Sequence, residues 1–233
     1  AVAMKVLLID DHPLILSALQ SVIQGLGDDV TVIGAGSAKA GREALQADSD
    51  FDLVLLDLSL GDADGFDVLA EFRHQYPALP VVVVSASDRS SDVIRAIDLG
   101  AMGFVPKRAS NDALFEALRM VMSGGIYVPP MEMRSDLSAP PIDSDTVPSV
   151  LRVVRENADE PARAYPPLES LGLTPRQTDV LALLLQGKPN KLIARDLNLS
   201  VETVKDHVAA VLRTLNVSSR TQAVLAVSQM SHK

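Results

Sequence analysis

The chain has 233 residues, of which 47% are hydrophobic and 22% charged, and it contains no cysteine. This composition is that of a globular protein, and it excludes a disulfide framework, thiol catalysis and a cysteine-based zinc site. The longest apolar runs are strand-sized and far shorter than the ~20 residues of a membrane span, and no charged segment precedes an apolar one at the N-terminus, so we expect a cytoplasmic protein without a membrane anchor.

Charged side chains are unevenly distributed along the chain. Residues 1–125 hold 9 Lys and Arg against 18 Asp and Glu, residues 126–172 hold 4 against 8, and residues 173–233 hold 8 against 4. A chain of this length is expected to form two domains. The charge pattern indicates a first domain that binds cations and a second domain that binds a polyanion.

The first 125 residues alternate between short apolar runs and helical patterns. One predicted helix begins at Pro13 and another follows Ser110, the expected N-cap residue. The predicted strands are Met4–Ile9, Val30–Ala35, Leu53–Leu56, Val81–Val84 and Met102–Val105. Apolar strands that alternate with helices predict a doubly wound α/β domain with a five-stranded parallel sheet, and any ligand site should lie beyond the carboxyl ends of its strands.

Five polar side chains fall at or just after the ends of these strands: Asp10, Asp11, Asp57, Ser85 and Lys107. Two carboxylates ~4 Å apart repel by about 4 kcal/mol at an effective dielectric constant of about 20, so we expect a divalent cation among the three. Oxygen ligands and a phosphate-receiving role favour Mg²⁺. Asp57 is the candidate nucleophile toward phosphorus, with Lys107 stabilising the transferred oxygens. The alternative is that each aspartate only caps the helix that follows it.

These residues lie in motifs that resemble the receiver domain of two-component response regulators, across residues 4–125. The matching segments are Leu8-Ile9-Asp10-Asp11-His12-Pro13, Leu55-Leu56-Asp57-Leu58 with Gly65, Val84-Ser85-Ala86, and Gly103-Phe104-Val105-Pro106-Lys107. The resemblance implies a flavodoxin/CheY-like fold. It also implies a phosphoacceptor at Asp57, Mg²⁺ ligands at Asp10, Asp11, Asp57 and the Ser59 carbonyl, and a switch pair at Ser85 and Phe104.

The same segment also contains Gly61 and His12. Gly61 stands where the family often has proline, so we expect a more mobile loop after Asp57. His12 is interpreted as a structural residue whose ring nitrogen bonds to a nearby carbonyl.

Residues 126–172 hold 8 of the 14 prolines, mixed with Ser, Asp and Glu, which is typical of a linker. Within it, Val147, Val150, Leu151 and Val154 recur at helical spacing. The linker is therefore predicted to contain a short amphipathic helix over 147–158.

From residue 173 to 233 the pattern is entirely helical. Thr174 and Gln177 form a capping box around Pro175, and this helix is predicted to end at Gly187. Asn190–Leu197 is a second helix. A third is predicted to run from a Ser200 cap to about Leu215, and a fourth to begin at Ser218 or Ser219 and to continue through Ala226.

The third helix has an apolar face and a polar face. The polar face carries Glu202, Lys205, Asp206, Ala209 and Arg213 and is expected to point outward. Two helices around a tight turn, the second with an exposed stripe, form a helix-turn-helix that places a recognition helix in the DNA major groove. The pattern alone also fits any three-helix bundle.

Residues 173–227 resemble the LuxR-type DNA-binding domain of the NarL/FixJ regulators. The matching positions are Leu173–Arg176, Val180, Leu181, Gly187, Asn190, Lys191, Ile193, Ala194, Leu197, Ser200, Thr203–Lys205, His207, Leu212, Leu215, Val217, Arg220 and Ala223. The expected DNA-contacting residues are Lys191, Thr203, Lys205, Asp206, Arg213 and Arg220. The sequence departs from the family at Gln177, Thr214, Asp206 and Ala209. An acidic side chain in the major groove, such as that of Asp206, is expected to restrict the DNA sequences that the domain can bind and to lower its affinity for DNA.

The two resemblances together predict a response regulator that a sensor histidine kinase phosphorylates on Asp57 and that then controls transcription by binding promoter DNA. We expect a homodimer in the phosphorylated state, RNA polymerase as a further partner, and no enzymatic activity beyond hydrolysis of its own aspartyl phosphate. One alternative is an atypical regulator that works without phosphorylation. The other is a Mg²⁺-dependent phosphatase with an aspartyl-phosphate intermediate, although such an enzyme needs Asp-x-Asp on its first strand and Asp10 is followed two positions later by His12.

Overall fold

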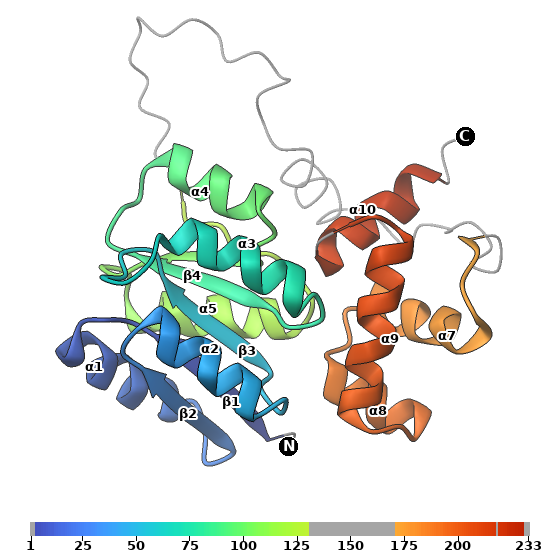
Figure 1. Ribbon diagram of the computed structural model, residues 1–233, viewed down its shortest axis with the longest axis horizontal. Helices are drawn as coiled ribbons and strands as arrows, with labels where there is room; N and C mark the ends of the chain where they lie inside the picture. The colour runs from blue at the N-terminus through green and yellow to red at the C-terminus, as the bar shows by residue number, and fades with distance from the viewer. Residues whose placement is uncertain (1–2, 131–170, 218, 231–233) are drawn as a thin grey trace, which may run out of the picture.

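A computed structural model of the protein describes residues 3–130, 171–217 and 219–230 (Figure 1). The predicted helix over 147–158 lies outside the described residues. The N-terminal part is a sheet flanked by helices, and the C-terminal part is a helical domain beside it. In the described ranges, no helix combines the length and the apolar character needed to cross a membrane.

The sheet has five parallel strands in the order β2-β1-β3-β4-β5, which confirms the predicted architecture. The strands are β1 (Met4–Ile9), β2 (Val30–Ala35), β3 (Leu53–Asp57), β4 (Val81–Ser85) and β5 (Gly103–Pro106). The chain order reverses between β1 and β3, so the crevice at their carboxyl ends is where a ligand site is expected. Strands β3 and β4 each extend one residue beyond the predicted end and include Asp57 and Ser85.

Helices cover both faces of the sheet (Figure 1). They are α1 (Pro13–Gln24), α2 (Ala38–Ala47), α3 (Gly65–Gln75), α4 (Ser90–Asp98) and α5 (Asn111–Met122). Successive residues of β3 alternate between two cores: Val54 and Leu56 pack under α2, α3 and α4, whereas Leu53 and Leu55 pack under α1 and α5. Side chains on a strand point to opposite faces in turn, so both faces must be apolar, and this is why the strands read as continuous apolar runs.

The C-terminal domain consists of α7 (Pro175–Leu185), α8 (Asn190–Leu197), α9 (Val201–Thr214) and α10 (Arg220–Met230). The predicted capping box of α7 is present, with Gln177 N–H donating to Thr174 Oγ1 at 3.3 Å and Thr174 N–H donating to Gln177 Oε1 at 3.1 Å. Asn198 adopts a left-handed conformation (φ 55°), which makes the tight turn between α8 and α9.

The last helix differs from its predicted bounds. Ser219 Oγ accepts the Gln222 N–H at 3.2 Å and so caps α10, one of the two caps that the sequence left open. The helix continues to Met230 rather than ending at Ala226. The buried Val227, which packs against Leu181 and Val211, explains why the extra turn forms.

Candidate functional site

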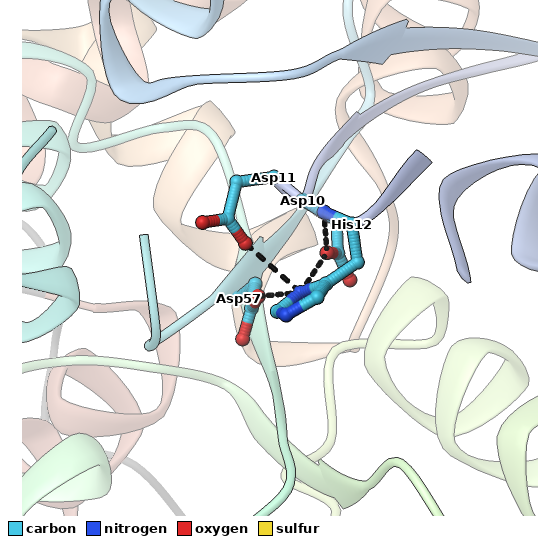
Figure 2. A group of neighbouring side chains, drawn as sticks. All are labelled: Asp10, Asp11, His12 and Asp57. Atoms are coloured by element: carbon cyan, nitrogen blue, oxygen red, sulfur yellow. Dashed lines mark hydrogen bonds and ion pairs between the residues drawn. The ribbon is translucent and has the colours of Figure 1, made fainter. Parts of the chain in front are cut away.

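Three carboxylates converge at the carboxyl ends of β1 and β3 (Figure 2). Asp10 directly follows β1, and Asp57 is the last residue of the neighbouring β3. Asp10, Asp11, His12 and Asp57 each place one potential ligand atom within 4.8 Å of the others. Asp10 and Asp57 are both 1% exposed, so their charges are held away from water.

Lys107 supplies a positive charge to this pocket from the end of β5, the edge strand that lies two strands away from β3. Its Nζ lies 3.0 Å from Asp57 Oδ2 and 3.2 Å from Asp10 Oδ2. Its backbone N–H donates to the Ser85 carbonyl at 2.7 Å, which fixes the chain just after β5. Burial by itself would lower the pKa of Lys107, but the ion pairs with Asp57 and Asp10 outweigh it and raise that pKa.

Burial of the Asp57 carboxyl disfavours its charged form. Burial raises its pKa, and the neighbouring Asp10 charge acts in the same direction, while the Ser59 N–H and Lys107 oppose the shift. The Ser59 N–H donates to Asp57 Oδ1 at 3.1 Å, so the loop after β3 turns back over the carboxylate. A buried carboxylate beside a second one is the arrangement that a cation or a covalent modification relieves.

Gly65, the first residue of α3, holds this loop in place. A Cβ at this position would lie 2.3 Å from Leu58 Cα and 2.5 Å from the Leu58 carbonyl oxygen, so only glycine allows this close approach. A Cβ at Gly61 would meet only Asp11 Oδ2, at 3.4 Å. The greater loop mobility expected from Gly61 stays a prediction.

The donor set of the pocket fits a divalent cation. Asp10 Oδ2 and Asp11 Oδ1 are buried and take part in no hydrogen bond with the described residues, although Lys107 and His12 lie within ion-pair distance of them. Buried carboxylate oxygens without donors are costly in a folded protein, and a hard cation would satisfy them. Asp10, Asp11 and Asp57 are the residues that would hold it.

His12 lies in the pocket, and its interpretation as a residue bonded to a carbonyl is wrong about the partner. Its Nδ1 lies 2.9 Å from Asp11 Oδ1, 3.1 Å from Asp10 Oδ1 and 3.8 Å from Asp57 Oδ2 (Figure 2). Its position next to the Asp10-Asp11 pair was the available sequence signal. The position of His12 in the sequence could not show that its ring turns back toward the Asp10, Asp11 and Asp57 carboxylates.

Of the two expected switch residues, Ser85 is the last residue of β4 and Phe104 lies within β5. Ser85 is buried, and its Oγ accepts the Ser87 N–H at 3.1 Å. Phe104 is fully buried in the core under α2, α3 and α4. The aromatic member of the switch pair that the receiver resemblance implies is therefore already inside the core in this structure.

The polar face of α9 faces the sheet domain across a cavity: Glu202, Asp206 and Arg213 are exposed as expected, whereas Lys205 is half-buried against that domain. Lys205 Nζ donates to the Ser49 and Phe51 carbonyls at 2.5 and 2.6 Å. Burial lowers the pKa of Lys205 despite nearby aspartates. Lys191, in α8, lies 2.7 Å from Asp52 Oδ2. Both predicted DNA-contacting lysines are thus held by the acidic loop between α2 and β3.

The other predicted contacts of α9 lie around the same interface. A cavity of about 420 Å³ separates the domains, and its α9 wall consists of Glu202, Lys205, Asp206, Ala209 and Arg213. Thr203, in the first turn of α9, has its hydroxyl 2.7 Å from Ser200 Oγ, which caps the helix.

Arg220 is not on the predicted DNA-contacting surface. It is 5% exposed; its Nη1 donates to the Lys188 carbonyl at 2.7 Å, and its Nη2 contacts Asn190 Oδ1. Both contacts are inside the C-terminal domain, so Arg220 braces the segment from which Lys191 projects. The sequence pattern could not separate this structural role from phosphate binding, because both require an arginine.

A second buried arginine, Arg73 of α3, lies on the sheet-domain side of this interface. Its Nη2 donates to the Tyr76 carbonyl at 3.0 Å, and the nearby Ala78 carbonyl accepts Asn190 Nδ2 at 3.1 Å. Among the described residues no carboxylate pairs with Arg73 or Arg220, and the Nε of each is buried without a partner. Burial lowers the pKa of each to about 10, and the charge of Arg220 contributes to the shift at Arg73.

Comparisons with known proteins cover both domains. Residues 6–119 match the model of the response regulator receiver domain, and residues 171–227 match that of the bacterial regulatory proteins of the luxR family. The chain is 33% identical over 226 residues to the glycerol metabolism activator of Pseudomonas putida, covering 97% of this chain and 96% of that protein. It is 32% identical over 224 residues to the nitrate/nitrite response regulator NarL of Escherichia coli K12, covering 96% and 94%.

A solved structure of the Salmonella typhimurium response regulator RcsB shares the fold. It aligns with a TM-score of 0.52 and 21% identity, covering 98% of this chain and 99% of that one. The matches to both domain families and to full-length relatives, together with the acidic pocket and the helix-turn-helix, lead to one conclusion. The chain belongs to the two-component response regulators of the NarL/FixJ type, which carry a receiver domain and a LuxR-type DNA-binding domain.

Proposed function

We propose that phosphorylation of Asp57 releases the α9 face from the receiver domain and thereby switches DNA binding on. The observation that carries this proposal is that Lys205 and Lys191, the predicted DNA contacts, are bound to the receiver loop through Ser49, Phe51 and Asp52. A DNA phosphate and this loop would compete for the same ammonium groups.

The pocket supports phosphoryl transfer from the phosphohistidine of a sensor kinase. An Asp57 oxygen would form the new bond to phosphorus as the phosphorus–nitrogen bond breaks and its electron pair returns to the imidazole. Lys107 is placed at Asp57 Oδ2 to stabilise charge on the transferred oxygens. Bound Mg²⁺ would neutralise the crowded carboxylates and phosphoryl oxygens, with Asp10, Asp11, Asp57 and the Ser59 carbonyl as its proposed ligands.

Two elements connect the pocket to the domain interface. Strand β3 begins directly after Asp52 and ends at Asp57, and α3 begins at Gly65 beside the pocket loop and ends at Gln75, which lines the interdomain cavity. Each spans about 16 Å. A shift of the Asp57 loop or of Ser85 at one end of the sheet would therefore be transmitted by a rigid strand and a rigid helix to the α9 contacts.

The released face of α9 and α8 is the proposed DNA surface. Lys191, Thr203, Lys205, Asp206 and Arg213 would contact the major groove and its phosphates, with Arg220 supporting them from within the domain. A single domain of this size makes few phosphate contacts, so we propose that a homodimer binds two half-sites. We propose a sensor histidine kinase and promoter DNA as the partners, and the cytoplasm as the location where the protein meets both.

The test is labelling of the full chain with a small phosphodonor and Mg²⁺, followed by mass spectrometry and DNA-binding anisotropy. The wild-type chain should gain one phosphoryl group and bind duplex DNA more tightly, whereas Asp57→Asn should gain none and stay in the weakly binding state. Asp28→Asn, which removes an exposed acid on the opposite end of the domain, serves as the matched control. Labelling of Asp57→Asn, or labelling of the wild type without any change in DNA affinity, would refute the proposal.

A further inference from the structure

Asp62 connects the loop after Asp57 to the beginning of α2. Its Oδ1 accepts the Ala38 N–H at 3.0 Å, and its Oδ2 accepts the Lys39 N–H at 3.1 Å. These are the first two residues of α2, and Asp62 lies 24 and 23 residues further along the chain. The two bonds lower the pKa of Asp62, because the N–H groups favour its charged form. Both carboxylate oxygens are therefore bound to a helix that is distant in sequence.

These bonds are additional to the cap that α2 already has. Ser37 is the N-cap residue, and its hydroxyl accepts the Ala40 N–H at 3.0 Å. Serine is among the preferred residues at this position, so the helix has a cap of its own. The Asp62 carboxylate adds a favourable charge at the helix N-terminus. Unlike Ser37, it also ties this end of α2 to a separate part of the domain.

The loop that carries Asp62 also borders the acidic pocket. A Cβ at Gly61 would lie 3.4 Å from Asp11 Oδ2, so the backbone next to Asp62 is close to a proposed cation ligand. Earlier in the same loop, the Ser59 N–H donates to Asp57 Oδ1 at 3.1 Å. A cation or phosphoryl group that changes the positions of Asp11 and Asp57 would therefore shift this loop.

The other end of α2 leads to the contacts that hold the C-terminal domain. The Asp48 N–H donates to the Ala44 carbonyl at 3.1 Å, so the acidic loop between α2 and β3 continues directly from the last turn of the helix. This loop binds Lys205 and Lys191. Helix α2 lies on the same face of the sheet as α3 (Figure 1) and spans about 15 Å. A shift at its first turn would therefore reach the acidic loop.

We propose that Asp62 is a positioning residue: it transmits a shift of the loop after Asp57 to α2, and α2 then loosens the hold of the acidic loop on the lysines of α8 and α9. The inference rests on the proposed function, because phosphorylation of Asp57 supplies the shift. It goes beyond that function by adding α2 to β3 and α3 as a connection between the pocket and the domain interface, and by assigning this connection to one side chain.

The experiment compares the full-length wild type with Asp62→Ala, which removes both acceptors, and with Ser37→Ala. Ser37→Ala weakens the same end of α2 by loss of a cap but leaves the bonds to the loop after Asp57 intact, so it is the matched control. Each chain is labelled with a small phosphodonor and Mg²⁺, and the labelling is measured by mass spectrometry. Backbone amide signals of residues 48–52 are followed by heteronuclear NMR, and DNA affinity by fluorescence anisotropy.

All three chains should gain one phosphoryl group, because the Asp62 carboxylate is bound to α2 and not to the pocket. Labelling should shift the amide signals of residues 48–52 and raise DNA affinity in the wild type and in Ser37→Ala. In Asp62→Ala most of both changes should be lost. Equal changes in all three chains overturn the inference, because β3 or α3 would then carry the whole effect. Failure of Asp62→Ala alone to be labelled also overturns it, because the side chain would then act on the pocket itself.

These outcomes are separable from failure of the proposed function. If the amide shifts depend on Asp62 but DNA affinity changes in no chain, the positioning role stands and the proposed switch fails. If labelling raises DNA affinity equally in the wild type and in Asp62→Ala, the switch stands and the positioning role fails. If Asp57 is never labelled, Mg²⁺ alone supplies the change in the pocket: amide shifts at residues 48–52 that require Asp62 support the inference, and their absence overturns it.

Discussion

At the residue scale, Asp57 is destabilised by burial and by repulsion from the neighbouring Asp10 carboxylate. The carboxyl is buried next to Asp10, and a single ammonium group, that of Lys107, lies within 3.2 Å of an oxygen of each. A receiver needs its phosphoacceptor ionised and accessible to phosphorus. The buried ionised carboxylate therefore lowers the stability of the folded domain while it provides the reactive group.

This conflict predicts that Asp57→Asn melts at a higher temperature than the wild type when no divalent cation is present. Because burial raises the pKa of Asp57 in the folded state, its contribution to stability is present at acidic pH and is lost as pH rises through that raised pKa. The gain should therefore be largest at neutral pH and shrink as the pH is lowered, with roughly 2–4 °C for each kcal/mol relieved in a chain of this length. Scanning calorimetry at several pH values, with and without Mg²⁺, measures it, and a lower melting temperature for Asp57→Asn would contradict the crowding of charges.

At the element scale, the position of the pocket loop depends on how α3 packs on the end of β3. Asp64 caps α3 by accepting the Phe66 N–H at 2.8 Å, and the Gly65 N–H donates to the Leu58 carbonyl at 3.2 Å. The first turn of the helix is thus bonded directly to the loop that carries Ser59, a proposed cation ligand through its carbonyl.

Gly65→Ala should accordingly destabilise the receiver domain and weaken cation binding together. The new methyl group would meet Leu58 backbone atoms at 2.3 Å, and backbone cannot rotate away as a flexible side chain can. Overpacking of this kind costs about 1–3 kcal/mol. Urea denaturation and Mg²⁺ titration measure the two effects. Gly36→Ala, where an added Cβ meets nothing within 4 Å, should change neither, and a neutral result for Gly65→Ala would show that the loop adapts freely.

At the scale of the whole molecule, α9 can be docked on the receiver domain, here called the covered state, or free of it, here called the released state. Attractive and repulsive electrostatic contacts at the domain interface set the balance between these two states. The loop between α2 and β3 attracts Lys191 and Lys205, whereas Arg73 and Arg220 bring two buried positive charges to the same interface. Buried like charges without a counter-ion oppose the covered arrangement.

The attractive contact predicts that Asp52→Asn raises the DNA affinity of the unphosphorylated full chain severalfold. Asparagine keeps an oxygen for the Lys5 N–H that Asp52 accepts at 2.8 Å, but it loses the charge that holds Lys191. Fluorescence anisotropy with a duplex DNA at fixed salt measures the change. The phosphorylated wild type and variant should bind alike, and an unchanged affinity of the unphosphorylated variant would mean that this ion pair does not hold the domains together.

The repulsive contact predicts the opposite effect for Arg73→Gln. This variant keeps a donor for the Tyr76 carbonyl but removes one of the two buried charges, so the covered state should gain stability and DNA affinity without phosphorylation should fall. Arg73→Lys retains the charge and should resemble the wild type. Tighter DNA binding by Arg73→Gln would show instead that the arginine stabilises the covered state.

What the sequence alone determined is what depends on local pattern. The five strands, the Ser110, Thr174 and Ser200 caps, and the order of the helices follow from apolar periodicity and cap residues within a few positions of each other. Asp10 and Asp57 could be expected to meet because carboxyl ends of neighbouring parallel strands share one edge of the sheet.

Only the tertiary structure decided which way His12 turns, that Arg220 is buried, and that Lys205 on the polar face of α9 contacts the receiver domain. Lys205 and the Ser49 carbonyl are 156 residues apart in the chain, and no local pattern encodes their contact. A charged helical stripe is equally compatible with water, with DNA and with an acidic loop of the same chain, because all three solvate its ammonium groups. The choice among them is made by the packing of the two domains.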